Sequence, residues 1–181
     1  MAPSISHDAT SHARWSQRTG DANSYRPAMT TAPDSFAPHR IEPSHVGLCV
    51  SDLEASLRFY CDGLGFAIAE SYALDDTAMP GLANALEVTS PVIVQSQMIT
   101  KGGLKIELLA YTSPPPTGTP SQSRGHRGLT HLTFVVADVD SVAAHLVECG
   151  GTILASTDVS VGVRLLFLAD PDGTRVELMA Y

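Results

Sequence analysis

Residues 41–181 carry an alternation of apolar and polar positions that changes period several times, and the same order of periods occurs twice. Short runs of branched residues are typical of strands, and apolar residues three or four positions apart are typical of helices. In the first half, these patterns predict strand, helix, strand, strand and strand. The expected elements are a strand at 45–50, a helix at 51–64, a strand that begins near 66, and strands at 91–99 and 104–111 joined by a hairpin at 100–103.

The first helix has sequence signals at both ends. Ser51 followed by Glu54 has the spacing of a capping box, so we expect Ser51 to be the N-cap. Gly63 and Gly65 end the helix after an apolar stripe that consists of Leu53, Leu57, Tyr60 and Leu64. The polar stretch 75–84, which contains proline and glycine, predicts a loop or short turn.

The second half repeats this order of elements. Asp138 is expected to cap a helix that ends at Gly150 and Gly151. Its apolar stripe consists of Val139, Val142, Ala143, Leu146 and Val147. Strands are expected at 131–136, 152–155, 163–169 and 174–181, and the sequence Asp170-Pro171-Asp172-Gly173 predicts a tight turn between the last two.

Two short sequences occur once in each half. The segments 105–111 and 175–181 are near copies, each with a glutamate at its third position, and the segments 45–52 and 131–138 each run from a histidine to an aspartate. Each half therefore supplies one imidazole and one carboxylate. If the two halves meet, these side chains form a four-ligand site for a divalent metal, and the candidate ligands are His45, Glu107, His131 and Glu177.

Each of these residues also has a plain structural interpretation. A histidine at the start of a strand is often held by hydrogen bonds, and a glutamate in an apolar strand often faces solvent. Four candidate ligands at equivalent positions of two matching halves are harder to explain by independent structural needs, because a buried carboxylate without a partner is costly. The duplication therefore favours the metal site.

The chain divides into four parts by composition. Residues 1–40 are rich in Ser, Thr, Ala and Pro, so we expect a disordered or loosely attached tail. Residues 41–112 and 129–181 are expected to be the two modules of one domain. Residues 113–128, rich in proline and small polar residues, are expected to be the linker between them.

Net charge, hydropathy and cysteine content limit the partners and the location that we expect for the protein. The net charge of −8 and the absence of a basic stripe argue against a nucleic-acid partner. No apolar run approaches the roughly 20 residues needed to cross a bilayer, so we expect no membrane partner. Three cysteines without CxxC spacing predict reduced thiols and a cytoplasmic location.

These residues resemble the vicinal oxygen chelate superfamily, which includes glyoxalase I, methylmalonyl-CoA epimerase, extradiol dioxygenases and bleomycin-resistance proteins. The resemblance extends over residues 41–181. It rests on the opening at 45–54, the helix exit with Phe59-Tyr60 and Leu64-Gly65-Phe66, the restart Gly128-Leu-Thr-His131, and the close Phe167-Leu-Ala-Asp-Pro-Asp-Gly-Thr-Arg-Val-Glu177.

The resemblance implies an α+β fold in which two βαβββ modules form a cupped, open sheet of eight strands. By position it implies that His45, Glu107, His131 and Glu177 bind a divalent Ni, Co, Zn, Mn or Fe ion. Family members close the site either within one chain or between two chains. We expect a homodimer, because the paired modules leave sheet edges that need cover.

The expected chemistry is removal of a proton next to a carbonyl, with Glu177 and Glu107 as candidate bases. The expected partner is a small-molecule substrate with vicinal oxygens or an acyl thioester. The resemblance leaves a glyoxalase I-like lyase, of the lactoylglutathione lyase type, and an epimerase open. An iron-dependent extradiol dioxygenase and a non-enzymatic binding or resistance protein are the alternatives.

Five other positions are candidates for the surroundings of the site. Arg124 and Arg127 flank His126 in the linker, where they form either a solvated basic cluster or an anion clamp at the entrance of the site. Gln97 and Tyr111 are candidates for the lining of the cup.

Overall fold

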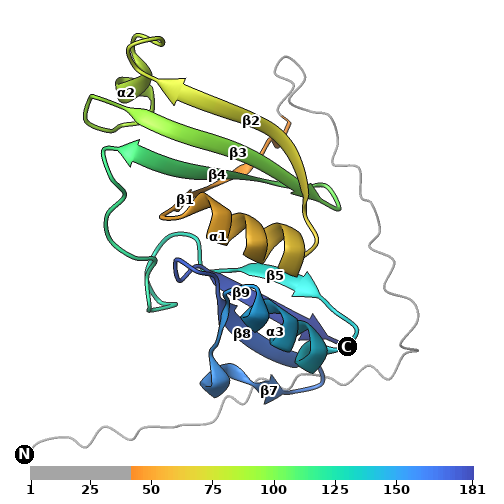
Figure 1. Ribbon diagram of the computed structural model, residues 1–181. Helices are drawn as coiled ribbons and strands as arrows, with labels where there is room; N and C mark the ends of the chain where they lie inside the picture. The colour runs from red at the N-terminus through yellow and green to blue at the C-terminus, as the bar shows by residue number, and fades with distance from the viewer. Residues whose placement is uncertain (1–41) are drawn as a thin grey trace, which may run out of the picture. The chain divides into compact units, whose positions relative to one another are not determined.

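The computed structural model describes residues 42–181, and the tail expected at 1–40 lies outside this range. Four strands form the first sheet in the order β1-β4-β3-β2. Strand β1 runs parallel to β4, whereas β3 is antiparallel to both of its neighbours. The strands are β1 (Val46–Val50), β2 (Ala67–Asp75), β3 (Ile93–Lys101) and β4 (Leu104–Ser113), as Figure 1 shows.

Five strands form the second sheet, in which β5-β9-β8-β6 are neighbours and β7 also pairs with β8. Its first strand again lies parallel to its last. Of the strand expected at 152–155, only residues 152–153 are extended, because the turn η2 (Ala155–Thr157) begins at its last residue, and a further short strand that was not predicted follows this turn. The strands are β5 (Leu132–Val135), β6 (Thr152–Ile153), β7 (Val159–Ser160), β8 (Arg164–Ala169) and β9 (Arg175–Ala180).

An aspartate caps the start of each of the two helices that were predicted. Asp138 caps α3 (Val139–Glu148), as predicted, and accepts hydrogen bonds from the N–H groups of Asp140 and Ser141. The prediction of a Ser51 cap was wrong by one residue. Asp52 is the N-cap of α1 (Leu53–Leu57), because its carboxylate accepts the N–H of Ala55 at 3.0 Å. A π-helical turn, η1 (Arg58–Gly63), continues α1.

One hydrophobic core contains residues from both sheets and both helices. Phe59 and Tyr60 on η1 and Leu146 on α3 are fully buried in it. The helices approach closely where side chains are missing: a Cβ on Gly151 would lie 2.7 Å from the ring of Phe59, and a Cβ on Gly63 would lie 2.8 Å from Leu146. The apolar face of each helix is thus covered.

These elements confirm the predicted α+β fold with cupped, open sheets. The strands of residues 42–181 form two sheets, of four and five strands, where one sheet of eight strands was expected, and each sheet places its first strand beside its last. A short helix, α2 (Leu82–Ala85), interrupts the loop predicted at 75–84. Within residues 42–181, no helix combines the length and the apolar character that a membrane crossing requires.

A buried polar contact joins the two halves of the core. The hydroxyl of Tyr60 donates to Oδ2 of Asp170 at 2.9 Å. The other oxygen of Asp170 accepts the N–H groups of Asp172 and Thr174 and so builds the predicted tight turn. Burial raises the pKa of Asp170, although these hydrogen bonds act in the opposite direction.

Asp170 therefore predicts an unusual dependence of stability on pH. The folded protein holds the Asp170 proton more tightly than the unfolded chain, so this carboxyl adds stability below its ordinary pKa of about 3.9 and loses that contribution as pH rises through the raised value. Asp170→Asn cannot titrate. We expect its free energy of unfolding, relative to wild type, to rise from about pH 4 to about pH 7 in urea denaturation. A difference independent of pH would contradict this prediction.

Candidate functional site

The first histidine and glutamate meet across parallel strands. His45 directly precedes β1, and Gly47 pairs in register with Glu107 on β4. Nε2 of His45 lies 3.1 Å from Oε2 of Glu107. The hydroxyl of Ser96 donates to the other carboxylate oxygen, and the hydroxyl of Ser44 lies 3.0 Å from Nδ1 of the imidazole. Ser44 and Ser96 thus contact the imidazole and the carboxylate of this first pair at the atoms that do not face each other.

The second pair repeats this geometry at equivalent positions. Thr133 on β5 pairs in register with Glu177 on β9, as Gly47 does with Glu107. Nε2 of His131 lies 3.5 Å from Oε2 of Glu177, and the Thr133 hydroxyl donates to the same oxygen at 2.7 Å. Nδ1 of His131 is buried and has no hydrogen-bond partner in the described part of the chain. Such an orphaned nitrogen is costly, and within residues 42–181 the His131 ring, unlike that of His45, has no hydrogen bond at Nδ1 that would orient it.

Both carboxylates leave the sheets on the faces opposite α1 and α3. Ile106 and Leu108, the neighbours of Glu107, are fully buried in the core, and alternation along β4 turns Glu107 to the other face. On β9, fully buried Val176 and Leu178 place Glu177 in the same way. The side chains of Glu107 and Glu177 are only 17% and 9% exposed, so these open faces are partly dry.

The two residues proposed for the lining of the cup lie on different faces. Tyr111 shares the face of Glu107, and burial together with the charges of Cys49 and Glu107 raises its pKa. Gln97 does not line this face, because it pairs with Leu108 and donates to backbone carbonyls. A second apolar cluster beside α2, to which Leu82, Val92 and Val94 belong, packs against Tyr111.

Aromatic and cationic groups surround the second pair. Phe167 is the cross-strand neighbour of Glu177, and its ring meets that of His131 edge-on at 5.4 Å. The guanidinium of Arg124, from the predicted linker, lies 3.7 Å above the same ring. His126 is bonded to Ser121 instead, at 2.9 Å. Arg124 is therefore the member of the basic cluster that reaches the second pair.

The four predicted ligands form two separate pairs. Within residues 42–181, no group of three or more His, Cys, Asp or Glu side chains is close enough together to hold a metal ion. The donor chemistry of the pairs fits a divalent ion, because each combines an imidazole Nε2 with a carboxylate oxygen. Two ligands alone do not fill a coordination sphere, so each pair amounts to half of the predicted site.

Sequence reasoning missed the side chains that support the pairs. No sequence motif marks Ser96, Thr133 or Phe167. Their positions on strands that neighbour the two glutamates are the signal that could have identified them. The three cysteines, Cys49, Cys61 and Cys149, are free thiols, as the spacing predicted. Burial raises the pKa of Cys49 and of Cys61, which lowers their reactivity.

Comparison with known proteins extends over most of the described chain. The uncharacterized protein YaeR of Escherichia coli (strain K12) is 32% identical over 139 residues, which are 74% of this chain and 92% of that protein. The 2-epi-5-epi-valiolone epimerase of an Actinomyces species is 27% identical, over 78% of this chain and 80% of the epimerase.

Solved structures share the fold at lower identity. A glyoxalase family protein from Bacillus cereus superposes with a TM-score of 0.66 at 18% identity, over 80% of this chain and 97% of that one. The fosfomycin resistance protein FosX from Listeria monocytogenes, solved with Mn(II) and a sulfate ion, gives 0.50 at 18% identity, over 77% and 92%. The model of the Glyoxalase/Bleomycin resistance protein/Dioxygenase superfamily matches residues 42–178, and the chain belongs to this superfamily.

Proposed function

We propose that the protein is a divalent-metal-dependent enzyme that removes a proton from a carbon next to a carbonyl, as a glyoxalase I-like lyase or an epimerase. The observation that carries this proposal is the repeated His–Glu pair. His45–Glu107 and His131–Glu177 occupy equivalent positions at the first and last strands of their sheets, with each Nε2 facing a carboxylate oxygen. Two unrelated structural needs do not produce such a match.

His45, His131, Glu107 and Glu177 would hold the ion. A divalent ion supplies Lewis-acid stabilisation of the oxyanion that develops when the proton leaves. Manganese in the related FosX structure supports a divalent ion in this fold. Ser96 and Thr133 orient the carboxylates by donating hydrogen bonds to them, so that neither has to reorganise during the reaction.

Glu177 is the proposed base. Its side chain is 9% exposed, against 17% for that of Glu107, so Glu177 is the better shielded from bulk water. Phe167 covers one side of this pair and limits the access of water. The base can return the proton to the same carbon, to its opposite face or to the neighbouring carbon, which distinguishes an epimerase from a lyase or isomerase.

The epimerase form has support of its own. The relative from Actinomyces is named an epimerase, and it aligns with more than three quarters of both chains. An epimerase substrate would keep its carbon skeleton, and the only net change would be at one stereocentre. Inversion of one stereocentre in deuterated solvent, with deuterium taken up at that carbon and the connectivity of the substrate unchanged, would identify this form.

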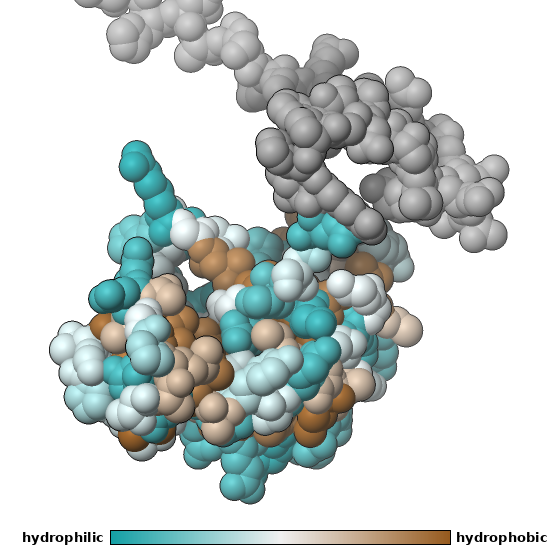
Figure 2. Space-filling view, turned by 90° about the horizontal axis from the view of Figure 1, so that it is seen from above, coloured by the Kyte–Doolittle hydropathy of each residue, from teal (hydrophilic) through white to brown (hydrophobic). Residues whose placement is uncertain are grey.

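We further propose that the complete site forms between two chains. The faces that carry the pairs also carry exposed apolar side chains: Tyr72 pairs with Ser96 on the face of Glu107 and is 47% exposed, and Val135 pairs with Met179 on the face of Glu177 and is 65% exposed. Figure 2 shows apolar patches open to view between polar side chains. A second copy that covers these faces would bring the missing half of each site.

Mixing two double variants tests where the site forms. His45→Ala/Glu107→Ala lacks the first pair, and His131→Ala/Glu177→Ala lacks the second. Neither variant alone should retain metal. In a mixed dimer, one site between the chains keeps both intact pairs, so affinity-tagged mixed dimers are expected to hold about one ion per two chains in elemental analysis.

The alternative outcomes of this experiment are distinct. Mixed dimers without metal, from a wild type that carries it, would show that the pairs join within one chain. A wild type without metal after supplementation would refute the metal-dependent enzyme and favour a small-molecule binding protein. Iron together with oxygen consumption on a catechol would favour the extradiol dioxygenase.

A further inference from the structure

A surface cavity is lined by residues that neighbour both His–Glu pairs along their strands. Its volume is about 330 Å³, and it is lined by residues from β1, from the segment 120–130 and from the start of β9. Gly47 on its wall is the strand partner of Glu107, Thr130 directly precedes His131, and Arg175 lies two residues before Glu177 on the same face of β9. The cavity thus borders both halves of the proposed site.

The charged side chains that line this cavity are all positive. Among its lining residues within 42–181, the charged ones are Arg127 and Arg175, although the whole chain has a net charge of −8. No carboxylate in that range forms an ion pair with either arginine. Arg175 donates to the neutral side chain of Gln122 at 2.9 Å. Two cations on one wall repel each other unless an anion lies between them.

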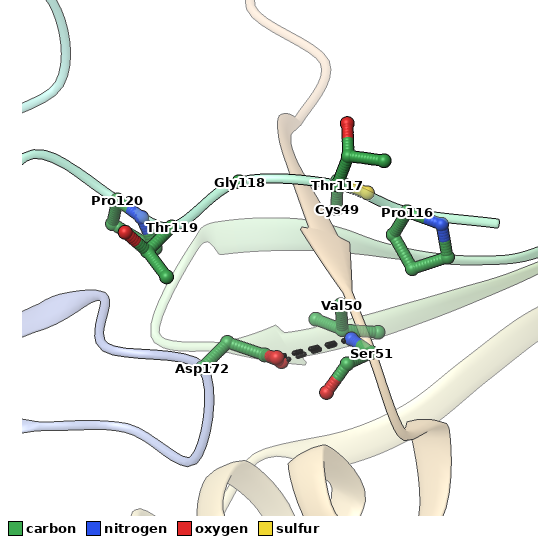
Figure 3. Close-up of a pocket in the computed structure, with 9 residues that line it drawn as sticks. All are labelled: Cys49, Val50, Ser51, Pro116, Thr117, Gly118, Thr119, Pro120 and Asp172. Atoms are coloured by element: carbon green, nitrogen blue, oxygen red, sulfur yellow. Dashed lines mark hydrogen bonds between the residues drawn. The ribbon is translucent and has the colours of Figure 1, made fainter.

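Two acidic residues lie close to Arg175 along the chain, and both are held by other groups: Glu177 faces His131 and accepts a hydrogen bond from Thr133, and Asp172 is turned toward β1. Asp172 lines an adjoining cavity that shares Cys49 and Pro120 with this one. Both of its carboxylate oxygens accept the N–H of Ser51 at 3.1 Å, and Figure 3 shows the side chain directed at that backbone group. Asp172 therefore helps to anchor β1, and the arginines keep their positive charge for a ligand.

We propose that this cavity binds a phosphate group. Guanidinium groups bind phosphate oxygens with paired hydrogen bonds, and a tetrahedral oxyanion accepts further hydrogen bonds from hydroxyls. Thr130 and Thr174 bring hydroxyls to the same wall. If the proposed enzymatic function holds, on which this last step rests, the cavity anchors a phosphorylated substrate or a thioester whose carrier is phosphorylated. The phosphate site itself does not depend on that function.

Pyrophosphate binding tests the site directly. Full-length protein in EDTA, which removes metal as a competing phosphate ligand, is titrated with inorganic pyrophosphate at low ionic strength and followed by amide NMR. We expect saturable shifts at Gly128, Thr130 and Thr174. Arg127→Gln and Arg175→Gln should each weaken binding by at least about tenfold, or about 1.4 kcal/mol, and Arg127→Lys should restore only part of it.

Arg58→Gln is the matched control. Arg58 lies on η1 among residues of a different surface hollow, and the same charge is removed. It should bind pyrophosphate like wild type. Equal weakening in all three glutamine variants would reduce the effect to net charge, and the absence of saturable binding would refute the site. Both results hold whether or not the protein carries metal, so they are separable from failure of the proposed function.

Discussion

We expect the Glu107→Ala variant to lose its bound metal. The purified wild type, supplemented in turn with Ni, Co, Zn, Mn and Fe, should carry about one ion per chain in elemental analysis. The variant loses one of the two carboxylates that neutralise the ion, and it leaves His45 and Ser96 without their partner. Loss of a ligand should cost more than the tenfold to hundredfold typical of outer-sphere changes, so we expect affinity to fall by more than about a hundredfold.

Glu70→Ala provides the control for this experiment. Glu70 is a carboxylate on β2 of the same sheet, and its exposed side chain pairs with Lys105 at 3.6 Å. An exposed pair of this kind adds little stability, so the variant should fold and keep its metal. Retention of metal by Glu107→Ala, or equal loss in both variants, would remove Glu107 from the ligand set.

The parallel pairing of first and last strands follows from the duplicated sequence. Two near-identical strand segments with a glutamate at the same position, each preceded by a histidine strand, restrict the arrangement strongly, because both halves must fold alike. His45 and Glu107 meet for the same reason as His131 and Glu177: the parallel register brings residue 47 beside 107 and residue 133 beside 177.

Short local sequence signals predicted the structure less accurately than the duplication did. Ser51 matched a capping box, but its N–H bonds the distant Asp172, and the chain stays extended for one more residue until Asp52 caps the helix. The face of Gln97 depends on the register of β3 against its neighbours, and the pairing of β3 with β4 is irregular at Ile93/Val94, where the register skips Thr112 of β4. A single bulge reverses every side chain beyond it, and its place is determined by tertiary packing.

The distance between the two pairs could not be predicted either. The sequence identifies four equivalent ligands but not how the modules pack, and both modes of closure occur in the family. In the structure, η1 and α3 pack together in a common core, where Gly63 and Gly151 permit close contact. This packing uses the faces of the modules that carry α1 and α3, and the pairs lie on the opposite faces of the sheets.

Glu177→Gln is expected to reduce turnover by at least about a hundredfold, the lower range for the loss of a general base. Glutamine preserves the size of the side chain and an oxygen that can accept the hydrogen bond from Thr133, but it cannot take up a proton. The assay follows exchange of substrate protons with solvent deuterium, first on hemithioacetals and then on acyl-CoA thioesters. Metal content is measured on the same samples.

The comparison with Glu107→Gln decides which carboxylate is the base. Both variants lose one charge at equivalent positions, so a shared fall in metal content reports only the loss of a ligand. If Glu177 is the base, Glu177→Gln should remain slow when both variants are saturated with metal, whereas Glu107→Gln should recover. Near-normal proton exchange in metal-saturated Glu177→Gln would exclude it as the base, and a slow Glu107→Gln would transfer that role to the carboxylate held by Ser96.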